Sequence, residues 1–538
     1  MGRRIRWLGI VLILCFGLIL VQLTNIQFHR AAALSASQYN PRNSSAHTDN
    51  LRGDIFAADG TILAQSVPAT AGAYKYQRVY PQGALYGEVV GYDSVQWGTF
   101  GVEQTYNTQL SKHTQPATTI GQLLSPPPPT TDNVTLTIQP KLQQAAQTAL
   151  NNIDSAVGYK DGAVVAIDPT TGAVEAMYSN PSFDPTPLVS PYIKIENAGR
   201  AAQSAVDAEG FSARQPISYS EIFPPGSTFK VITTSTVFDL KPALANYSFP
   251  TAPCISLPNS NKLLCNDGST PATADPCGGN MSAMLPASCD PGYGQLGLLL
   301  GGTLLNQQAE AFGYNQVPPI DLPDVVASNF PSVADFGLCA TCVGPPGVAY
   351  SAIGQEDVAA SALQNALVAS GIADGGVVMT PHVMAEIRQA DNGQLVTTYQ
   401  PKPWLRATTQ ATAAEVTVLM QAVATRGTAA GRLSPGLNAA VKTGTAQTGR
   451  TDAAANTDDW MIGFAPANDP KIAVAVVVPY QEISTSGAEV AGPIMNCMLT
   501  TALDLTDLGG VGSACPAPAP AATPTTSSPT TTTTAAKR

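Results

Sequence analysis

The sequence predicts a mixed α/β protein whose central sheet combines strands from both ends of the folded region. Residues 162–179 contain two apolar, strand-like runs that flank a turn with Pro and Gly. Residues 439–446, 460–465 and 471–479 add three strand-like runs far downstream. Strands at both ends with helices between them predict that the sheet closes as an α/β sandwich.

The chain begins with an apolar run that predicts a membrane anchor. Residues 7–23 carry no charge and follow three arginines, an arrangement that favours a cytoplasmic N-terminus. We therefore expect residues 1–6 in the cytoplasm and residues 7–28 as a transmembrane helix. The protein would be a single-pass protein of the cell membrane, with the rest of the chain outside the cell. The alternative is a signal peptide cleaved near residues 31–33, which are all alanine.

The segments that follow divide into a pedestal, a large domain and a tail. Residues 29–132 are turn-rich with short alternating stretches, which predicts a small β-rich pedestal. Residues 133–138 alternate like a strand and residues 139–153 have helical periodicity, so a larger domain is expected over residues 133–510. Residues 511–538 are mostly Ala, Pro, Ser and Thr and are expected to form a disordered tail.

Composition excludes several classes of function. The 538 residues carry a net charge of −11, only 12% of them are charged, and no basic patch stands out. Because clustered Lys and Arg bind phosphate backbones, we expect no nucleic-acid partner. The four histidines are scattered, so the sequence suggests no metal site, and it implies no cofactor.

The cysteines after the apolar run are expected on the oxidising side of the membrane, where disulfides persist. We expect Cys339 to pair with Cys342 and Cys497 to pair with Cys515. Three other cysteines cannot be assigned a partner from the sequence: Cys254, Cys265 and Cys277.

Residues 227–230, Ser-Thr-Phe-Lys, are the most informative stretch, because helical spacing puts a hydroxyl and an amine on one face. A serine needs a nearby proton acceptor to act as a nucleophile, and a lysine held neutral can serve. Pro-Gly before Ser227 predicts that this serine opens a helix, where unpaired N–H groups favour developing negative charge. Alone, the tetrad also fits a surface serine and a solvated lysine.

Two later motifs favour the catalytic interpretation. Residues 288–290 (Ser-Cys-Asp) and residues 442–445 (Lys-Thr-Gly-Thr) follow the tetrad in that order, and the latter lie in a strand-like run. This order of motifs is the signature of penicillin-binding proteins and serine β-lactamases.

The resemblance to class B penicillin-binding proteins extends well beyond these motifs. Residues 52–64 are similar to the first periplasmic segment of that family, and residues 162–172 to the hairpin that opens its transpeptidase domain. Residues 223–233, 352–355 and 460–466 match the family in the same order. The resemblance implies the penicillin-binding transpeptidase fold: a five-stranded antiparallel sheet with helices on both faces, an all-helical subdomain, and the nucleophile on a central helix.

Carried over by motif position, the resemblance implies a serine acyl-enzyme. Ser227 would attack the carbonyl of the penultimate D-Ala of a peptidoglycan stem peptide, and Lys230 would act as its base. Ser288 would relay a proton to the leaving amine. The backbone N–H groups of Ser227 and Thr445 would form the oxyanion hole.

The resemblance also implies that the Lys-Thr-Gly-Thr strand holds the substrate. Lys442 would meet the terminal carboxylate, and the hydroxyls of Thr443 and Thr445 would add donors. Gly444 would leave the strand bare, so that an extended peptide could pair with its edge.

Asp290 departs from the family pattern, which has asparagine at this position. A carboxylate cannot donate a hydrogen bond to the substrate amide carbonyl unless it is protonated. Two accounts stay open. With Pro291 after it, Asp290 suits the start of a helix. Alternatively, its carboxylate could hold Lys230 in the charged form and weaken it as a base.

The expected function is a peptidoglycan D,D-transpeptidase that forms peptide cross-links, releases terminal D-Ala and binds penicillin covalently. The resemblance implies stem peptides, β-lactams, a membrane-embedded glycan polymerase, and division or elongation proteins as partners, since no polymerase domain is expected in this chain. Two alternatives stay open: a scaffold of the wall-synthesis machinery with an impaired site, and a D,D-carboxypeptidase or β-lactamase that passes the acyl group to water.

Overall fold

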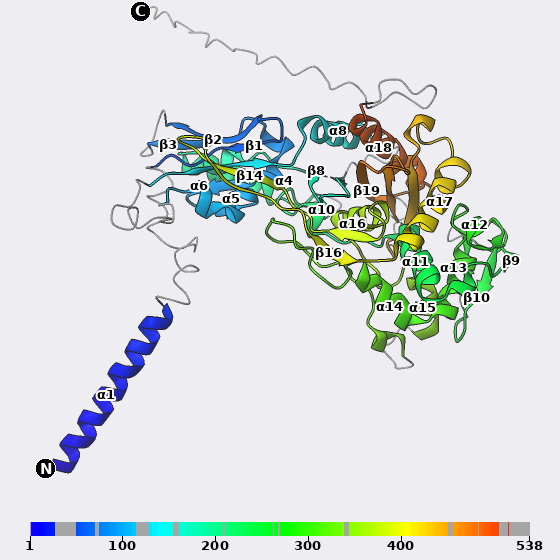
Figure 1. Ribbon diagram of the computed structural model, residues 1–538, viewed down its shortest axis with the longest axis horizontal. Coiled ribbons are helices and arrows are strands. Elements are labelled where there is room, and N and C mark those ends of the chain that lie inside the picture. The colour runs from blue at the N-terminus through cyan, green and yellow to red at the C-terminus, as the bar shows by residue number, and fades with distance from the viewer. Residues whose placement is uncertain are drawn as a thin grey trace, which may run out of the picture.

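The structure is a computed structural model. It describes residues 2–26, 50–69, 75–113, 129–153, 161–207, 210–261, 263–266, 270–337, 344–449, 456–482 and 484–504, together with Cys515. The first element is a helix, α1 (Gly2–Thr24) (Figure 1). Over the described ranges, no helix has both the length and the apolar character that crossing a membrane requires. The expected Cys339–Cys342 pair and, apart from Cys515, the expected tail lie outside the described residues.

A five-stranded antiparallel sheet forms the centre of the larger domain, as predicted. In spatial order its strands are β17 (Ala440–Gln447), β18 (Thr457–Ala465), β19 (Ile472–Gln481), β7 (Gly162–Ile167) and β8 (Val174–Asn180). Each strand overlaps a run that the sequence singled out. Segments far apart in the chain therefore meet in one sheet, and β17 lies at its edge.

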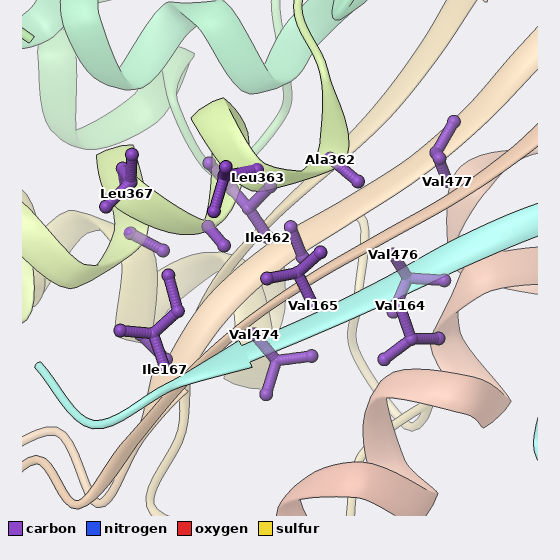
Figure 2. Close-up of a cluster of buried hydrophobic side chains, with 14 of the residues drawn as sticks. Val164, Val165, Ile167, Ala362, Leu363, Leu367, Ile462, Val474, Val476 and Val477 are labelled. Carbon is purple, nitrogen blue, oxygen red and sulfur yellow. The ribbon is translucent and has the colours of Figure 1, made fainter. Parts of the chain in front are cut away.

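Helices cover both faces of this sheet (Figures 1 and 2). Val165 and Ile167 point toward the helix on one face, whereas Val164 and Val476 lie on the other, because successive side chains of a strand alternate. All four side chains are fully buried. The covering helices are α16 (Ala362–Ala373) on the first face and α8 (Pro140–Asn151) and α18 (Gly487–Ala502) on the second.

A second sheet has six strands and draws on two distant parts of the chain. In spatial order they are β15 (Leu395–Thr398), β14 (Met384–Gln389), β6 (Asp132–Leu136), β1 (Ile55–Phe56), β2 (Ile62–Pro68) and β3 (Tyr76–Val79). The downstream hairpin β14–β15 pairs with β6 through β14. The boundary expected at residue 132 therefore falls within this sheet.

Buried charges join the six-stranded sheet to the short helix α5 (Val102–Thr105). Glu103 of this helix is fully buried and accepts hydrogen bonds from Arg52 Nε at 2.6 Å and from Arg78 Nε at 2.7 Å. Arg52 Nη1 also donates to the side chains of Asn107 and Ser111. One carboxylate thus binds two guanidinium groups in the interior of the N-terminal domain.

The segment between the two halves of the five-stranded sheet is not all-helical, so that prediction is wrong in this respect. Its helices include α11 (Lys230–Leu240), α12 (Met281–Met284), α13 (Asp290–Leu300), α14 (Gly302–Ala311) and α15 (Gly344–Ser351). Two short ladders join β9 (Phe249–Ala252) to β12 (Cys277–Gly279) and β10 (Cys254–Ser256) to β11 (Leu263–Cys265). Residues 250–280 are rich in Pro, Asn and Gly, which disfavour helices.

Disulfides hold these ladders and the C-terminal end of the domain. Cys254 pairs with Cys265 across β10 and β11, and Cys277 pairs with Cys289. The predicted disulfide between Cys497 and Cys515 is confirmed.

The remaining helices and strands are short connections apart from α9 and α17. They are α4 (Gly87–Val90), β4 (Tyr92–Ser94), β5 (Gly98–Phe100), α6 (Asn107–Leu110), α9 (Ile193–Gln203), α10 (Ile217–Ser220), β13 (Val377–Met379), β16 (Pro403–Arg406) and α17 (Gln410–Arg426).

Candidate active site

Ser227 lies in a 3-10 turn, η4 (Gly226–Phe229), that leads directly into α11. The Lys230 Nζ atom donates to the Ser227 Oγ atom at 2.8 Å. Lys230 is fully buried, whereas Ser227 is half-buried and so reachable from solvent. The structure therefore brings hydroxyl and amine together at the start of a helix, at the spacing that the sequence indicated.

The turn before Ser227 is fixed by contacts that only glycine allows. Gly226 has a φ of +52° and Gly354 a φ of +76°, a region that favours glycine. The Gly226 amide donates to the Gly354 carbonyl at 2.9 Å, and a Cβ on Gly354 would lie 2.2 Å from the Gly226 oxygen. On the other side, the buried Trp460 indole donates to the Pro224 carbonyl at 2.9 Å. These contacts orient Ser227, and Trp460 serves packing.

Ser288 links the two lysines of the site. Its Oγ atom lies 3.2 Å from Lys230 Nζ and 2.9 Å from Lys442 Nζ. Its carbonyl oxygen accepts a further hydrogen bond from Lys230 at 2.6 Å. Ser288 has a φ of +54°, an uncommon conformation for a residue other than glycine, which lets both of its oxygens face Lys230. One hydroxyl is thus placed to pass a proton between two amines.

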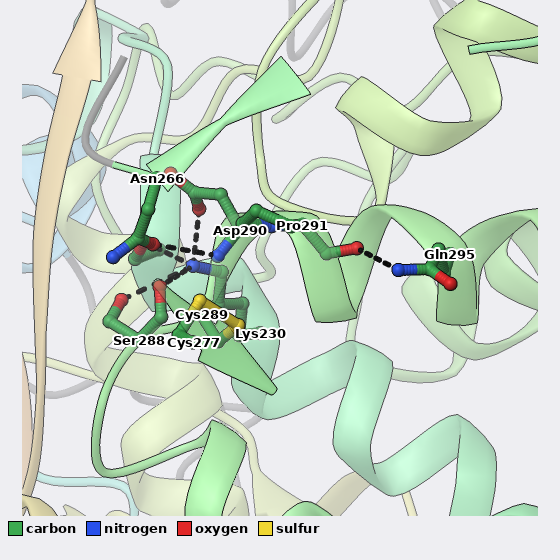
Figure 3. The surroundings of a disulfide bond; sticks show 9 residues. Lys230, Asn266, Cys277, Ser288, Cys289, Asp290, Pro291 and Gln295 are labelled. Atoms are coloured by element: carbon green, nitrogen blue, oxygen red, sulfur yellow. Dashed lines mark hydrogen bonds and ion pairs between the residues drawn. A yellow bond between two sulfur atoms is a disulfide. The ribbon is translucent and has the colours of Figure 1, made fainter. Parts of the chain in front are cut away.

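Asp290 forms an ion pair with Lys230 beside the Cys277–Cys289 disulfide (Figure 3). Its Oδ1 atom lies 2.5 Å from Lys230 Nζ, and its side chain is 15% exposed. Helix α13 begins at Asp290 after Cys289 as the N-cap, and no side-chain cap is found there within the described residues. The structure fits both accounts that the sequence left open: Asp290 starts α13 with Pro291 after it, and its carboxylate forms the ion pair that favours a charged Lys230.

The Lys-Thr-Gly-Thr motif lies on the edge strand β17, which packs against η4, the turn that carries Ser227. The fully buried Lys442 donates to the Ser288 hydroxyl and, at 2.8 Å, to the Thr443 carbonyl. The Thr443 hydroxyl lies 2.6 Å from that of Thr428. Thr445 is exposed, and its Oγ atom accepts the Gly487 amide at 3.0 Å. Both threonine hydroxyls therefore already have protein partners.

Gly444 has a packing reason for its identity. A Cβ there would lie 2.8 Å from the Pro225 oxygen and 3.0 Å from the Trp460 Cβ. A side chain at this position would push β17 away from the turn that precedes Ser227. Within the described residues β17 pairs with β18 alone, and Gly444 lets β17 lie close to the turn that carries Ser227.

The contacts of Lys230 describe a charged amine. The acceptors within hydrogen-bond distance of its Nζ atom include Ser227 Oγ, Ser288 O, Ser288 Oγ and Asp290 Oδ1. A charged lysine only donates hydrogen bonds, so Ser227 accepts one in this state. Lys230 must therefore lose a proton before it can take one from Ser227. Ser288 and Asp290 are the neighbours through which that proton can leave.

Two further residues of the site were missed by the sequence analysis. The Asn266 Oδ1 atom accepts a hydrogen bond from the backbone N–H of Asp290 at 3.1 Å (Figure 3). No local sequence pattern predicts this role. Asp459 on β18 is fully buried opposite Thr445, and burial raises the pKa of its carboxyl to about 7. The signal that could have identified Asp459 is a pair of aspartates, Asp458 and Asp459, directly before the apolar part of a strand.

The fold and the meeting of the three motifs define a penicillin-binding transpeptidase, and comparison with known families agrees. Residues 162–500 match the penicillin binding protein transpeptidase domain, and residues 52–134 match the penicillin binding protein A dimerisation domain. The chain belongs to the penicillin-binding transpeptidase family, as the sequence resemblance predicted.

Among individual proteins, the chain is similar to mycobacterial relatives over nearly its whole length. Peptidoglycan D,D-transpeptidase PbpA of Mycobacterium tuberculosis is 32% identical over 515 residues, 94% of this chain and 99% of that protein. PbpA of Mycolicibacterium smegmatis is 33% identical over 507 residues, with the same coverage of 94% and 99%. The ceftriaxone acyl-enzyme of M. tuberculosis penicillin-binding protein A has a TM-score of 0.74 and 31% identity, over 86% of this chain and 99% of that one.

Proposed function

We propose that this protein is a peptidoglycan D,D-transpeptidase that acts through an acyl-enzyme on Ser227 and is acylated there by β-lactams. The observation that carries the proposal is the 2.8 Å contact between Ser227 Oγ and Lys230 Nζ, in a site where Ser288 links Lys230 to Lys442. The names of the mycobacterial relatives, and the ceftriaxone, imipenem and penicillin G acyl-enzymes of M. tuberculosis penicillin-binding protein A, support it.

The first half-reaction forms an ester. Neutral Lys230 takes the Ser227 proton while Oγ bonds to the carbonyl carbon of the penultimate D-Ala. The N–H groups of Ser227 and Thr445 hold the oxyanion. The C–N bond to terminal D-Ala then breaks, and Ser288 passes a proton from Lys230 or Lys442 to the leaving amine. An amine of a second stem peptide attacks the ester, forms the cross-link and frees Ser227.

Strand β17 positions the donor peptide. The field of Lys442 attracts its terminal carboxylate, and the hydroxyls of Thr443 and Thr445 turn toward it when it arrives. The free edge of β17 pairs with the extended peptide backbone. The Asp290 carboxylate replaces an amide donor, so this substrate is held with one neutral donor fewer than in relatives that carry asparagine.

Cellular placement is proposed from the sequence. Residues 7–28 would anchor the protein in the cell membrane, because they are apolar and follow three arginines. Residues 29–132 would form a pedestal resembling a penicillin-binding protein dimerisation domain, and residues 133–510 the transpeptidase domain outside the cell. A membrane-embedded glycan polymerase and division or elongation proteins would be the protein partners.

Intact-mass spectrometry after exposure to benzylpenicillin tests the proposal. The wild-type protein should gain the mass of one penicillin at Ser227 and lose it slowly, because transpeptidases exclude water from the ester. The Ser227→Ala variant should gain nothing. A wild-type protein that stays unlabelled would favour a scaffold with an impaired site. Rapid release of hydrolysed penicillin would favour a β-lactamase.

A further inference from the structure

A carboxyl group that the proposed mechanism does not use lies on β18, the strand next to the one that is proposed to hold the substrate. Asp459 on β18 is the cross-strand partner of Thr445 on β17, so the two side chains share one face of the sheet. Asp459 is fully buried, whereas Thr445 is exposed. Burying a carboxyl group is costly unless its oxygens are satisfied, which makes its position next to a substrate-binding hydroxyl informative.

The hydrogen bonds around Asp459 are incomplete. Its Oδ2 atom accepts the Thr485 hydroxyl at 2.9 Å, from the loop that precedes α18. Its Oδ1 atom is buried and has no hydrogen-bond partner among the described residues. The Thr445 hydroxyl lies near enough to favour the ionised carboxyl.

The Thr445 hydroxyl accepts one hydrogen bond from the protein, and the acceptor for its own hydrogen can vary. Its Oγ atom accepts the amide hydrogen of Gly487, the first residue of α18. A hydroxyl has one hydrogen to donate, so the direction of that hydrogen is the remaining variable. It can point down to the Asp459 carboxyl or out to a ligand at the edge of β17.

We propose that Asp459 is a positioning residue that sets the direction of the Thr445 hydroxyl, and that its protonated form is the one that favours binding of a carboxylate-bearing substrate or β-lactam. This inference rests on the proposed function, because it assigns a carboxylate-binding role to Thr445.

The two protonation states present different surfaces to the substrate. When Asp459 is protonated, its carboxyl donates to Thr445 Oγ, and the Thr445 hydrogen is free to bind the incoming carboxylate. When Asp459 is ionised, it accepts the Thr445 hydrogen, and lone pairs face the substrate instead. The ionised carboxylate also adds a negative charge beneath the anion site. Both effects weaken substrate binding at higher pH.

The surroundings of Asp459 favour a change of charge near neutral pH. Burial raises the pKa of its carboxyl to about 7, against the effect of the Thr485 and Thr445 hydroxyls, and Glu489 on α18 raises it further. Val478 lies opposite on β19. The charged or titratable side chains on the elements packed around it are Lys442 on β17, Asp458 on β18, Tyr480 on β19, Glu482 in the loop before α18, and Glu489 with its ion-pair partner Arg432.

The test compares acylation of the wild type and of Asp459→Asn as a function of pH. An asparagine amide donates to Thr445 at every pH and so mimics the protonated acid. The ratio of the second-order acylation rates with benzylpenicillin, variant over wild type, should stay near unity below about pH 6 and rise to about tenfold by about pH 8.5. With benzylpenicillin methyl ester, which lacks the carboxylate, the ratio should stay flat.

A matched control uses another buried carboxyl. Burial also raises the pKa of Glu88 to about 7, but Glu88 lies on α4 and its carboxyl accepts from Ser218 on α10 rather than from a residue of β17, so Glu88→Gln should give a flat ratio. The inference would be overturned if the acylation-rate ratio for Asp459→Asn stayed flat with benzylpenicillin. It would also be overturned if the ratio rose equally with the methyl ester, or equally in Glu88→Gln. Absence of acylation at every pH would instead overturn the proposed function.

A second variant keeps the test decisive if Asp459→Asn does not fold. Thr485→Val removes a hydroxyl that favours the ionised form of Asp459. The fall in acylation rate should therefore move to higher pH by up to about one unit. A fall that stays where it is in the wild type would contradict the inference.

Discussion

The N-terminal domain and the active site each bury a cation with a carboxylate, but they do so in different ways. In the N-terminal domain, Glu103 is fully buried and binds two arginines through its two oxygens. In the active site, Lys230 is fully buried, whereas the side chain of its partner Asp290 is 15% exposed. Lys230 also shares its hydrogens with the reactive hydroxyl of Ser227.

The difference separates a structural ion cluster from a chemical one. Arginine stays charged at all relevant pH values, so the Glu103 cluster has one state. Lysine can lose its proton, and Lys230 lies between a carboxylate, two hydroxyls and a carbonyl, so its cluster has alternative proton positions. Burial supports stability in the first case and proton transfer in the second.

The largest expected effect is on stability, from the N-terminal cluster. Glu103→Gln would remove the carboxylate that two buried guanidinium groups share, although Arg52 keeps a 3.5 Å contact with Asp93, so we expect a loss of about 3–5 kcal/mol in the free energy of unfolding, measured with urea. The folded variant should still be acylated at the wild-type rate.

The control for this prediction is an exposed ion pair. Glu386→Gln breaks a surface pair with Arg388 and should cost less than about 1 kcal/mol. Equal losses in the two variants would show that burial does not distinguish these pairs.

Glu88 is a buried carboxyl group that should stabilise the fold when it is protonated, whereas Glu103 stabilises it as a carboxylate. Burial raises the pKa of Glu88 from 4.5 to about 7, and Ser218 donates to it at 3.3 Å. The folded state therefore holds the proton more tightly than the unfolded state. The stabilising contribution is complete below the unfolded pKa, declines as pH rises from about 4.5 to about 7, and is absent above, a fall of up to roughly 3 kcal/mol.

Urea unfolding at several pH values measures this contribution. Glu88→Gln should lack the decline that the wild type shows over this interval. A variant whose stability falls in parallel with that of the wild type would assign the decline to another group.

The smallest expected effect is on the pH profile of the active site. Asp290→Asn removes the carboxylate that favours charged Lys230, so the amine should become available as a base at lower pH. We expect the acidic limb of the benzylpenicillin acylation profile to shift down by about one to two pH units. Stopped-flow measurement of acylation across the pH range checks this.

Two other results would change the comparison. An unmoved limb would mean that Asp290 does not control the charge of Lys230. If only the Asp290→Asn variant were labelled and the wild type were not, the catalytically impaired scaffold would become the better assignment.

The five strands of the central sheet could be predicted because each is a short apolar run with its own turn signals, as residues 162–179 illustrate. The motif residues could be predicted because helical spacing already relates Ser227 to Lys230. Which strands pair across long separations could not, because local periodicity carries no information about partners. The joining of β14 to β6 and the Cys254–Cys265 and Cys277–Cys289 disulfides are of this kind.

The sequence offered two roles for Asp290 but could not show which of them the residue has. A helix start and an ion pair with Lys230 are both compatible with an aspartate, and the geometry shows that Asp290 has both roles. Asn266 and Asp459 act through neighbours that are distant in sequence, so their roles appear only when the strands and loops are assembled.

The hairpin β14–β15 in the six-stranded sheet constrains how the polypeptide folds as it is made. Strands β1, β2, β3 and β6 leave the ribosome early, but their sheet is incomplete until residues 384–398 follow. At about 5–20 residues per second, that interval is on the order of tens of seconds. During translation the edge of β6 is an open template for pairing with other nascent chains, so slow synthesis would favour aggregation of this half of the molecule.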